Sequence, residues 1–246
     1  MNLLKYLFWF CWRIWFYLLI ILPIVVLFPL LFLSILSEKT YHLFFKLARV
    51  WAKIIFYGMG FNLSIERDVI LEQKNPYMII SNHTSMIDIM LMLIIIRKNP
   101  FVFVGKKELA KFPLFGFFYK KTCIMVDRKD SKSRFQVFQQ AKMRLDKGLS
   151  ICIFPEGGIP KDKNILLDKF KDGAFRLAVE HQIPIVPITI ADVKSRFSYT
   201  FFSGSPGKIR VRLHTPIQTE HLKNDDKKKL KQQAYNTIFN QLKKFN

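Results

Sequence analysis

A histidine and a carboxylate stand five residues apart, at His83 and Asp88, directly after the apolar run Tyr77–Ile80. On one ideal helix this spacing leaves the two side chains ~140° apart, so they do not touch. They can meet if His83 lies in the turn before a helix, Thr84 or Ser85 caps that helix, and Asp88 lies on its first turns. A carboxylate on one imidazole nitrogen fixes the tautomer and leaves the other nitrogen free to take a proton from a hydroxyl. The spacing therefore favours a general base, whereas an isolated histidine at a strand end is more often structural.

Polar residues follow two further apolar runs. Arg128 comes shortly after Cys123–Val126, and the tripeptide Glu156-Gly157-Gly158 comes shortly after Ile151–Phe154. An arginine can contact a phosphate through two hydrogen bonds, although an isolated one is more often a surface ion-pair partner. Adjacent glycines let the backbone approach a ligand closely, although such a segment is often an ordinary turn.

The segments that must position these residues alternate along the chain. Short apolar or β-branched runs predict strands at 77–80, 101–104, 123–126, 150–154, 183–190 and 208–213. Helices are expected between them, at roughly 85–96, 107–120, 131–147 and 173–181, and a basic surface helix is expected at 225–245. This alternation predicts an α/β domain with a mostly parallel central sheet flanked by helices. Ligands in such folds gather beyond the strand ends.

The N-terminal region is apolar. The 23 residues Ile14–Leu36 carry no charge, and at ~1.5 Å per residue they are long enough to cross a ~30 Å hydrocarbon layer. We therefore expect a hydrophobic helical segment that anchors the chain in a membrane. A cleaved signal peptide is disfavoured because Arg13 interrupts the first apolar run and no small-residue cleavage site follows. Pro23 and Pro29 leave open whether the segment spans the bilayer or breaks and re-enters it.

A second N-terminal helix is expected just after this run. Apolar residues recur at helical spacing between Leu43 and Ile55, while Lys46, Arg49 and Lys53 fall together on another face. A basic amphipathic helix of this kind suits a membrane surface, and a core-packed helix is the alternative. The predicted organisation is residues 1–60 as membrane-binding helices and residues 61–246 as the α/β domain.

The chain is strongly basic, with 39 Lys and Arg against 18 Asp and Glu and a net charge of +21. Such an excess predicts a polyanionic partner, and the apolar segment favours membrane phospholipids over nucleic acid. Basic residues after the apolar run favour a cytoplasmic location for the main domain. The three cysteines are widely spaced in apolar runs, so neither a disulfide framework nor a zinc site is expected.

Four short motifs in this order resemble those of the glycerophosphate acyltransferase family, most closely its 1-acylglycerol-3-phosphate acyltransferase branch. The resemblance covers roughly residues 60–215. Its first motif is matched by Asn82, His83 and Asp88, and its last by Val186-Pro187-Ile188. The second motif, Thr122–Arg128, begins with threonine where the family usually has glycine. The third motif, Phe154–Gly158, ends with glycine where the family commonly has threonine. Neither departure removes a group that the reaction requires.

The resemblance implies transfer of a fatty acyl group to the free hydroxyl of lysophosphatidic acid, which gives phosphatidic acid. The acyl donor is then acyl-CoA or acyl carrier protein as co-substrate, with no cofactor and no metal. Another lyso-lipid or glycerol 3-phosphate is an alternative acceptor. A protein of a different class, which binds anionic lipid without catalysis, would explain the charge but not the paired His83 and Asp88.

In this interpretation His83 is the general base, and Asp88 orients it and stabilises the imidazolium. No serine or cysteine is placed like an acylation centre, so the substrate hydroxyl is expected to attack the thioester directly. Backbone amides near His83 or Gly157 are candidates for stabilising the developing oxyanion. The residues expected to contact substrate are Asn82, Lys106, Arg128, Glu156, Gly157 and Gly158.

Overall fold

The computed structural model describes residues 3–73, 75–127, 130–160, 162 and 164–245. Its chain divides into two compact units, each built from separate segments. The first comprises Met1–Ser64, Thr84–Arg97 and Ala191–Arg210, and the second comprises Ile65–His83, Lys98–Ile190 and Val211–Asn246. The domain boundary at residue 60 stays a prediction, and the two units are described separately below.

The N-terminal apolar run is split between two helices of the first unit, α1 (Leu3–Val26) and α2 (Phe28–Ser34). α1 ends three residues after Pro23, whose carbonyl oxygen accepts the Leu27 amide at 2.9 Å. Pro29 lies in the first turn of α2, where a missing N–H costs nothing. α1 therefore continues through Pro23 and is interrupted at Leu27, and whether the run spans the bilayer or re-enters it stays a prediction. Within the described residues, α1 is the one helix long and apolar enough to cross a membrane by length and composition.

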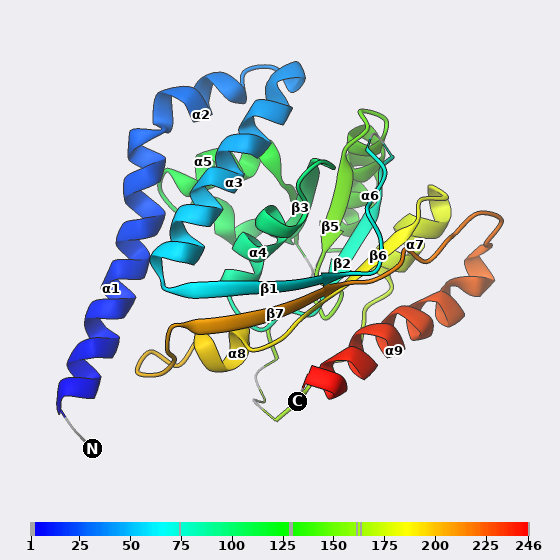
Figure 1. Cartoon of the computed structure of the whole chain (residues 1–246). Helices are drawn as coiled ribbons and strands as arrows, with labels where there is room; N and C mark the ends of the chain where they lie inside the picture. Colours follow the sequence, from blue (N-terminus) through cyan, green and yellow to red (C-terminus); the bar gives the residue numbers. More distant parts are fainter. Residues whose placement is uncertain (1–2, 74, 128–129, 161, 163, 246) are drawn as a thin grey trace. The chain divides into compact units, whose positions relative to one another are not determined.

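α1 packs antiparallel against α3 (Tyr41–Gly58), which follows the short 3₁₀ turn η1 (Glu38–Thr40) (Figure 1). The indole N–H of Trp15 donates to the Gly58 carbonyl at 2.8 Å, and that of Trp51 donates to the Ile20 carbonyl at 3.0 Å. α3 also packs against α4 (Ile87–Ile95), an almost wholly apolar helix. The predicted amphipathic helix is thus present.

One side of α1 remains uncovered by protein. Large apolar side chains along it are exposed, among them Leu7, Phe10, Ile14, Trp15, Leu18, Leu22 and Val25. On α3, Leu43, Val50, Ile54 and Tyr57 are also exposed. An exposed apolar surface of this extent is typical of proteins that associate with membranes.

A seven-stranded sheet has the order β1-β7-β6-β2-β5-β3-β4. β2, β3, β4, β5 and β6 pair in parallel, whereas β7 runs antiparallel to β6, so the predicted mostly parallel sheet is confirmed. The strands are β1 (Phe61–Arg67), β2 (Met78–Ser81), β3 (Phe101–Lys106), β4 (Ile124–Val126), β5 (Ser150–Ile153), β6 (Ile185–Ile190) and β7 (Gly207–Leu213). β1 was not among the strands expected from the sequence.

Helices of the second unit cover the sheet. α6 (Ser131–Leu145) packs on β4 and β5, while α7 (Gly173–Glu180) contacts β2 and α9 (Lys227–Phe245) contacts β6 (Figure 1). β2 and β6 are buried along their whole length, as expected for parallel strands with both faces covered. The remaining short elements are the helix α8 (Val193–Arg196) of the first unit and the 3₁₀ turn η3 (Asn224–Asp226).

The single helix expected over residues 107–120 is wrong. The segment forms a 3₁₀ turn, η2 (Lys107–Lys111), and then a separate helix, α5 (Phe115–Thr122). Pro113 causes the break, because proline disfavours helical backbone in the residue before it, and Phe112 is extended.

Candidate active site

Asn82 ties the end of β2 to the end of β6. Its side-chain N–H donates to the Ile190 carbonyl at 2.8 Å, and its side-chain oxygen accepts the Ile190 amide at 2.8 Å. The residue is 1% exposed. Both ends of the amide are therefore used to hold the position from which His83 follows.

His83 is fixed through its backbone and its ring. Its amide N–H donates to Oε1 of Glu156 at 2.7 Å. Its imidazole stacks on Phe154, with ring centroids 4.1 Å apart and planes inclined by 17°, and Phe154 stacks in turn near Phe103. A ring held flat against an aromatic face has few orientations available, which suits a proton acceptor that must meet its substrate in one geometry.

Glu156 joins His83 to a third segment of the second unit. The side chain is buried, and its second oxygen, Oε2, accepts the amide of Asp168 at 2.9 Å. A carboxylate that accepts backbone N–H groups on both oxygens holds two chain segments at a fixed separation. Glu156 therefore has a positioning role, and its predicted contact with substrate stays a prediction.

The turn after Glu156 requires a glycine. Gly157 has a φ of +81°, and its amide N–H donates to the Phe154 carbonyl at 3.0 Å. A Cβ atom at Gly157 would lie 2.6 Å from Nζ of Lys171. The tight turn brings Glu156 back toward His83 and keeps the Gly157-Gly158 backbone near the chain end of β5.

Asp88 lies in the first turn of α4, as predicted. Within the first unit, its Oδ2 accepts the amide of Thr84 at 2.6 Å and that of Ser85 at 2.8 Å. A carboxylate is favoured at a helix N-terminus by the helix dipole. Thr84 follows His83 directly in the chain, so the amides that hold Asp88 belong to the turn that the sequence predicted. A contact between the His83 and Asp88 side chains stays a prediction.

Ser85 secures the same turn, but the expectation that Thr84 or Ser85 caps the helix is wrong, because the N-cap residue is Met86 and no side chain caps this helix. Its hydroxyl accepts the Ile87 amide at 3.3 Å and donates to the Phe197 carbonyl at 2.5 Å. The helix itself begins at Ile87, with Met86 as its formal N-cap residue. Because the Ser85 hydroxyl is buried and engaged, it is not a nucleophile.

The thiols of Cys123 and Cys152 are equally unsuited to attack. Burial raises the pKa of Cys123 to about 12, and it raises the pKa of Cys152 well above its usual value. Both therefore stay protonated near neutral pH. This is consistent with direct attack by a substrate hydroxyl.

The predicted phosphate contacts are only partly visible. Lys106 is exposed at the end of β3 and pairs in register with Val126, two residues before Arg128. Arg128 itself lies outside the described residues. The preceding residue, Asp127, donates its amide to the Ser133 hydroxyl at 2.8 Å.

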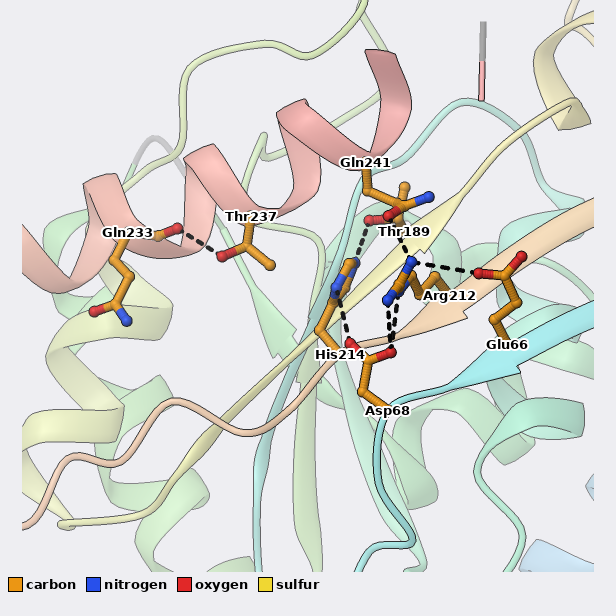
Figure 2. Close-up of polar contacts among 8 residues, drawn as sticks. All are labelled: Glu66, Asp68, Thr189, Arg212, His214, Gln233, Thr237 and Gln241. Atoms are coloured by element: carbon orange, nitrogen blue, oxygen red, sulfur yellow. Dashed lines mark hydrogen bonds and ion pairs between the residues drawn. The ribbon is translucent and has the colours of Figure 1, made fainter. Parts of the chain in front are cut away.

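A second polar cluster, which no sequence pattern predicted, lies between the sheet and α9 (Figure 2). His214 bonds to Thr189 through Nε2 at 2.8 Å, while its Nδ1 lies 3.7 Å from Asp68. Arg212 pairs with Asp68 and Glu66 and also contacts Gln241 of α9. Asp68 and His214 also line a cavity of about 450 Å³. The contacts tie β1, β6 and β7 to α9, which is a structural role.

Sequence reasoning missed residues whose contribution is made by backbone or by packing. Phe154 belongs to the third motif, and that position is the one sequence signal for the ring that stacks on His83. The amide of Asp168 has no side-chain signal. In the sequence Arg13 only interrupts an apolar run, whereas in the structure its guanidinium forms several hydrogen bonds in the first unit.

Comparison with known proteins identifies relatives. Residues 63–191 match the family model described as Acyltransferase. The 1-acyl-sn-glycerol-3-phosphate acyltransferase alpha of Ovis aries is 30% identical over 183 residues, covering 74% of this chain and 63% of that protein. This chain therefore matches less than two thirds of that relative's length. A probable 1-acyl-sn-glycerol-3-phosphate acyltransferase of Mycoplasma pneumoniae is 27% identical over 220 residues, covering 81% of each chain.

A solved structure shares the fold. The 1-acyl-sn-glycerophosphate (LPA) acyltransferase PlsC of Thermotoga maritima superposes with a TM-score of 0.77 at 19% identity, covering 100% of this chain and 98% of that one. The likeness extends over the N-terminal helices as well as the sheet.

Proposed function

The chain belongs to the Acyltransferase family, and from this premise we propose that it moves a fatty acyl group to the sn-2 hydroxyl of 1-acylglycerol-3-phosphate, giving phosphatidic acid for phospholipid synthesis. The names of its relatives from Ovis aries and Mycoplasma pneumoniae support this acceptor. The observation that carries the proposal is the fixed position of His83, with its amide on Glu156 and its ring on Phe154.

In the proposed mechanism His83 takes the proton from the substrate hydroxyl as that oxygen attacks the thioester carbonyl. A C–O bond forms, the C–S bond breaks, and the leaving thiolate receives the proton from the imidazolium. Asp88 stabilises the positive charge that forms on His83. The carbonyl oxygen becomes negative in the tetrahedral intermediate and needs donors.

The described hydrogen bonds narrow the choice of oxyanion donors. The amides of His83, Thr84 and Ser85 donate to carboxylates, and that of Gly157 donates to the Phe154 carbonyl. We propose that the backbone N–H of Gly158 donates to the carbonyl oxygen as it becomes negative. Its missing side chain also leaves room for the acyl group.

Lys106, at the end of β3, and Arg128, two residues after β4 in the sequence, are the proposed contacts for the acceptor phosphate. Arg128 supplies a bidentate contact and Lys106 adds positive potential. Asn82 and Glu156 contribute by hydrogen-bonding to backbone groups and so positioning the chain around His83. The Gly157 backbone forms the tight turn beside it. An acceptor without a phosphate would depend less on Arg128.

The acyl donor is proposed to be acyl-CoA or acyl carrier protein, since both are anionic and the chain has a net charge of +21. The N-terminal helices anchor the protein, with the catalytic domain on the cytoplasmic face. No cofactor or metal ion takes part in the proposed reaction. Undiminished turnover after exhaustive treatment with EDTA is the expected result.

The deciding experiment measures thiol release by detergent-solubilised protein supplied with acyl-CoA and lysophosphatidic acid. His83→Ala should lose activity by at least about a hundredfold while staying folded. His42→Ala, at an exposed histidine on α3, serves as the control and should keep full activity. Normal turnover by His83→Ala would defeat the mechanism.

Parallel arms identify the substrates. Acyl carrier protein replaces acyl-CoA in one arm, and glycerol 3-phosphate or other lyso-lipids replace lysophosphatidic acid in others. Turnover only with another acceptor would keep the mechanism and change the reaction. No turnover in any arm, with salt-sensitive lipid binding retained, would favour the non-catalytic lipid-binding protein.

A further inference from the structure

An exposed aromatic loop lies between α8 and β7, in the first unit. Its seven residues, Ser198–Gly204, carry no charge, and three of them are aromatic. Tyr199 is 61% exposed, Phe201 39% and Phe202 45%. Three aromatic rings uncovered in one short loop are unusual for a surface that faces only water.

Arg13 fixes this loop to the middle of α1. Its guanidinium donates to the carbonyls of Phe201 at 3.0 Å, Ser198 at 2.8 Å and Thr200 at 2.7 Å, with a longer bond to that of Ser203. The guanidinium also lies 4.0 Å from the centre of the Phe197 ring. The residue is 4% exposed.

The loop and α1 are also packed together tightly. Phe202 meets Tyr6 with ring centroids 5.1 Å apart, and the Trp9 indole donates to the Gly204 carbonyl at 3.0 Å. A Cβ atom at Gly204 would lie 2.2 Å from the Arg196 carbonyl oxygen and 3.1 Å from the Trp12 ring. With a φ of +102°, this position is available only to glycine without strain.

In an apolar environment, separating the loop from α1 would leave the hydrogen-bond donors of Arg13 without acceptors. A guanidinium in hydrocarbon is costly unless its donors are satisfied, and here the loop carbonyls satisfy them. Wherever α1 enters the lipid at the level of Arg13, the loop enters with it. The rings of Phe201 and Phe202 then extend the exposed apolar side of α1.

The charge around the loop fits an anionic lipid surface. No carboxylate occurs between Asp192 and Glu220, whereas Lys194, Arg196 and Lys208 flank the loop. Tyrosine and phenylalanine are suited to the membrane interface, and cations beside them meet lipid phosphates.

We propose that Ser198–Gly204 is a second membrane-inserting element, which enters the lipid interface beside α1 and is held there by Arg13. Its aromatic side chains sit at the level of the headgroups and upper acyl chains. The segment begins directly after Phe197, whose carbonyl accepts the Ser85 hydroxyl. The loop thus connects the lipid surface to the turn that carries Asp88, independently of which lipid the enzyme uses.

Site-directed spin labelling measures the immersion of the loop. A nitroxide is placed at Phe202→Cys in a Cys11→Ser background, because Cys11 is exposed and would also react. Cys152 is buried and Cys123 is partly buried, and the raised pKa of each thiol makes both poorly reactive. Accessibility to oxygen and to a water-soluble nickel complex is compared with and without vesicles of phosphatidylcholine and phosphatidylglycerol. The label should become protected from nickel and exposed to oxygen when vesicles are added.

Labels at two other positions serve as controls for the immersion of residue 202. A label on the native Cys11, exposed on α1, reports whether α1 itself is immersed. A label at Phe135→Cys reports a side chain on α6 that is 61% exposed and is expected to stay in water. Immersion at residues 11 and 202 but not at 135 supports the proposal. A label at 202 that behaves like the one at 135 overturns it, whatever the label at 11 reports.

Two variants test the contribution of the side chains. Phe201→Ser with Phe202→Ser should weaken vesicle binding by about tenfold or more, because burial of one Phe side chain changes a partition equilibrium by that factor. Phe112→Ser with Phe135→Ser is the control, and a similar loss in both pairs would contradict the proposal. Arg13→Leu should leave the label at 11 immersed and return the label at 202 to water. Continued immersion at 202 would show that Arg13 does not hold the loop.

Discussion

Glu156 accepts a hydrogen bond from the backbone amide of His83 at 2.7 Å, while its other oxygen accepts the amide of Asp168. A buried acid thus fixes the main chain of the proposed base instead of its ring. The sequence suggested Glu156 as a substrate contact. In the described contacts Glu156 instead positions His83.

Replacing Glu156 by Gln should separate positioning from charge. The amide oxygen can still accept one backbone N–H, but the NH₂ group then faces the other donor. We expect kcat to fall by about tenfold to a hundredfold through misplacement of His83, with little change in KM. The free energy of unfolding should fall by about 1–3 kcal/mol because one buried N–H loses its partner.

The control for this variant is Glu180→Gln, on α7, where the carboxylate is half exposed and pairs with Arg176 at 3.8 Å. It should change neither kcat nor stability measurably. Equal effects in both variants, measured by steady-state kinetics and by urea unfolding, would contradict a positioning role for Glu156.

Asp88→Asn should keep the turn and lose the charge. The asparagine oxygen can accept the Thr84 and Ser85 amides as Oδ2 does. Without the carboxylate the imidazolium of His83 is less stable, so kcat should fall by about 10²- to 10⁴-fold. Asp225→Asn, at an exposed acid on η3, is the control. A kcat within twofold of the parent would remove Asp88 from the proposed mechanism.

Gly157→Ala tests the turn that returns Glu156 to His83. A non-glycine residue at a φ of +81° costs about 1–2 kcal/mol, and the new methyl group must also displace the Lys171 side chain. The matched control is Gly173→Ala at the start of α7, where a Cβ atom meets nothing within 4 Å. Alanine there should leave stability unchanged or raise it slightly, as measured by thermal unfolding.

Acid should destabilise the protein through His214. Burial lowers the pKa of His214 from 6.5 to about 4; Asp68 opposes this shift, whereas Arg212 and Lys244 add to it. Between these pH values the unfolded chain binds a proton that the folded chain does not, so stability falls as the pH falls from about 6.5 to about 4. The loss attributable to this group is up to about 3 kcal/mol.

Urea unfolding at a series of pH values measures this effect. His214→Gln should flatten the decline in that range, whereas His42→Gln should leave it unchanged. An identical pH dependence in the parent and in His214→Gln would mean that His214 titrates normally in the folded protein.

Much of the fold was predictable because it depends on local periodicity. Buried runs such as Tyr77–Ile80 and Ile183–Ile190 predicted central strands, and the Pro113 break could have been anticipated from proline geometry alone. β1 was overlooked although Phe61, Leu63 and Ile65 alternate with polar residues, which is the expected pattern of a half-covered strand.

The candidate site was predictable only in part. The position of Asp88 in the first turn of its helix followed from spacing. The pairing of Asn82 with Ile190 joins residues 108 positions apart, and no local pattern encodes such a contact. Arg13 is a similar case, because the carbonyls that surround it come from a loop almost 190 residues away.

The carboxylates of Glu156 and Asp88 are bound to the turn at residues 83–85 through main-chain groups, namely the amides of His83, Thr84 and Ser85. Every amino acid except proline carries such an N–H, so the side chain at position 84 can change without releasing either carboxylate. Residue 84 can therefore vary while these hydrogen bonds keep the proposed base, His83, in place. These hydrogen bonds exclude only proline at positions 83, 84 and 85, because proline has no backbone N–H. They place no limit on the side chain at position 84.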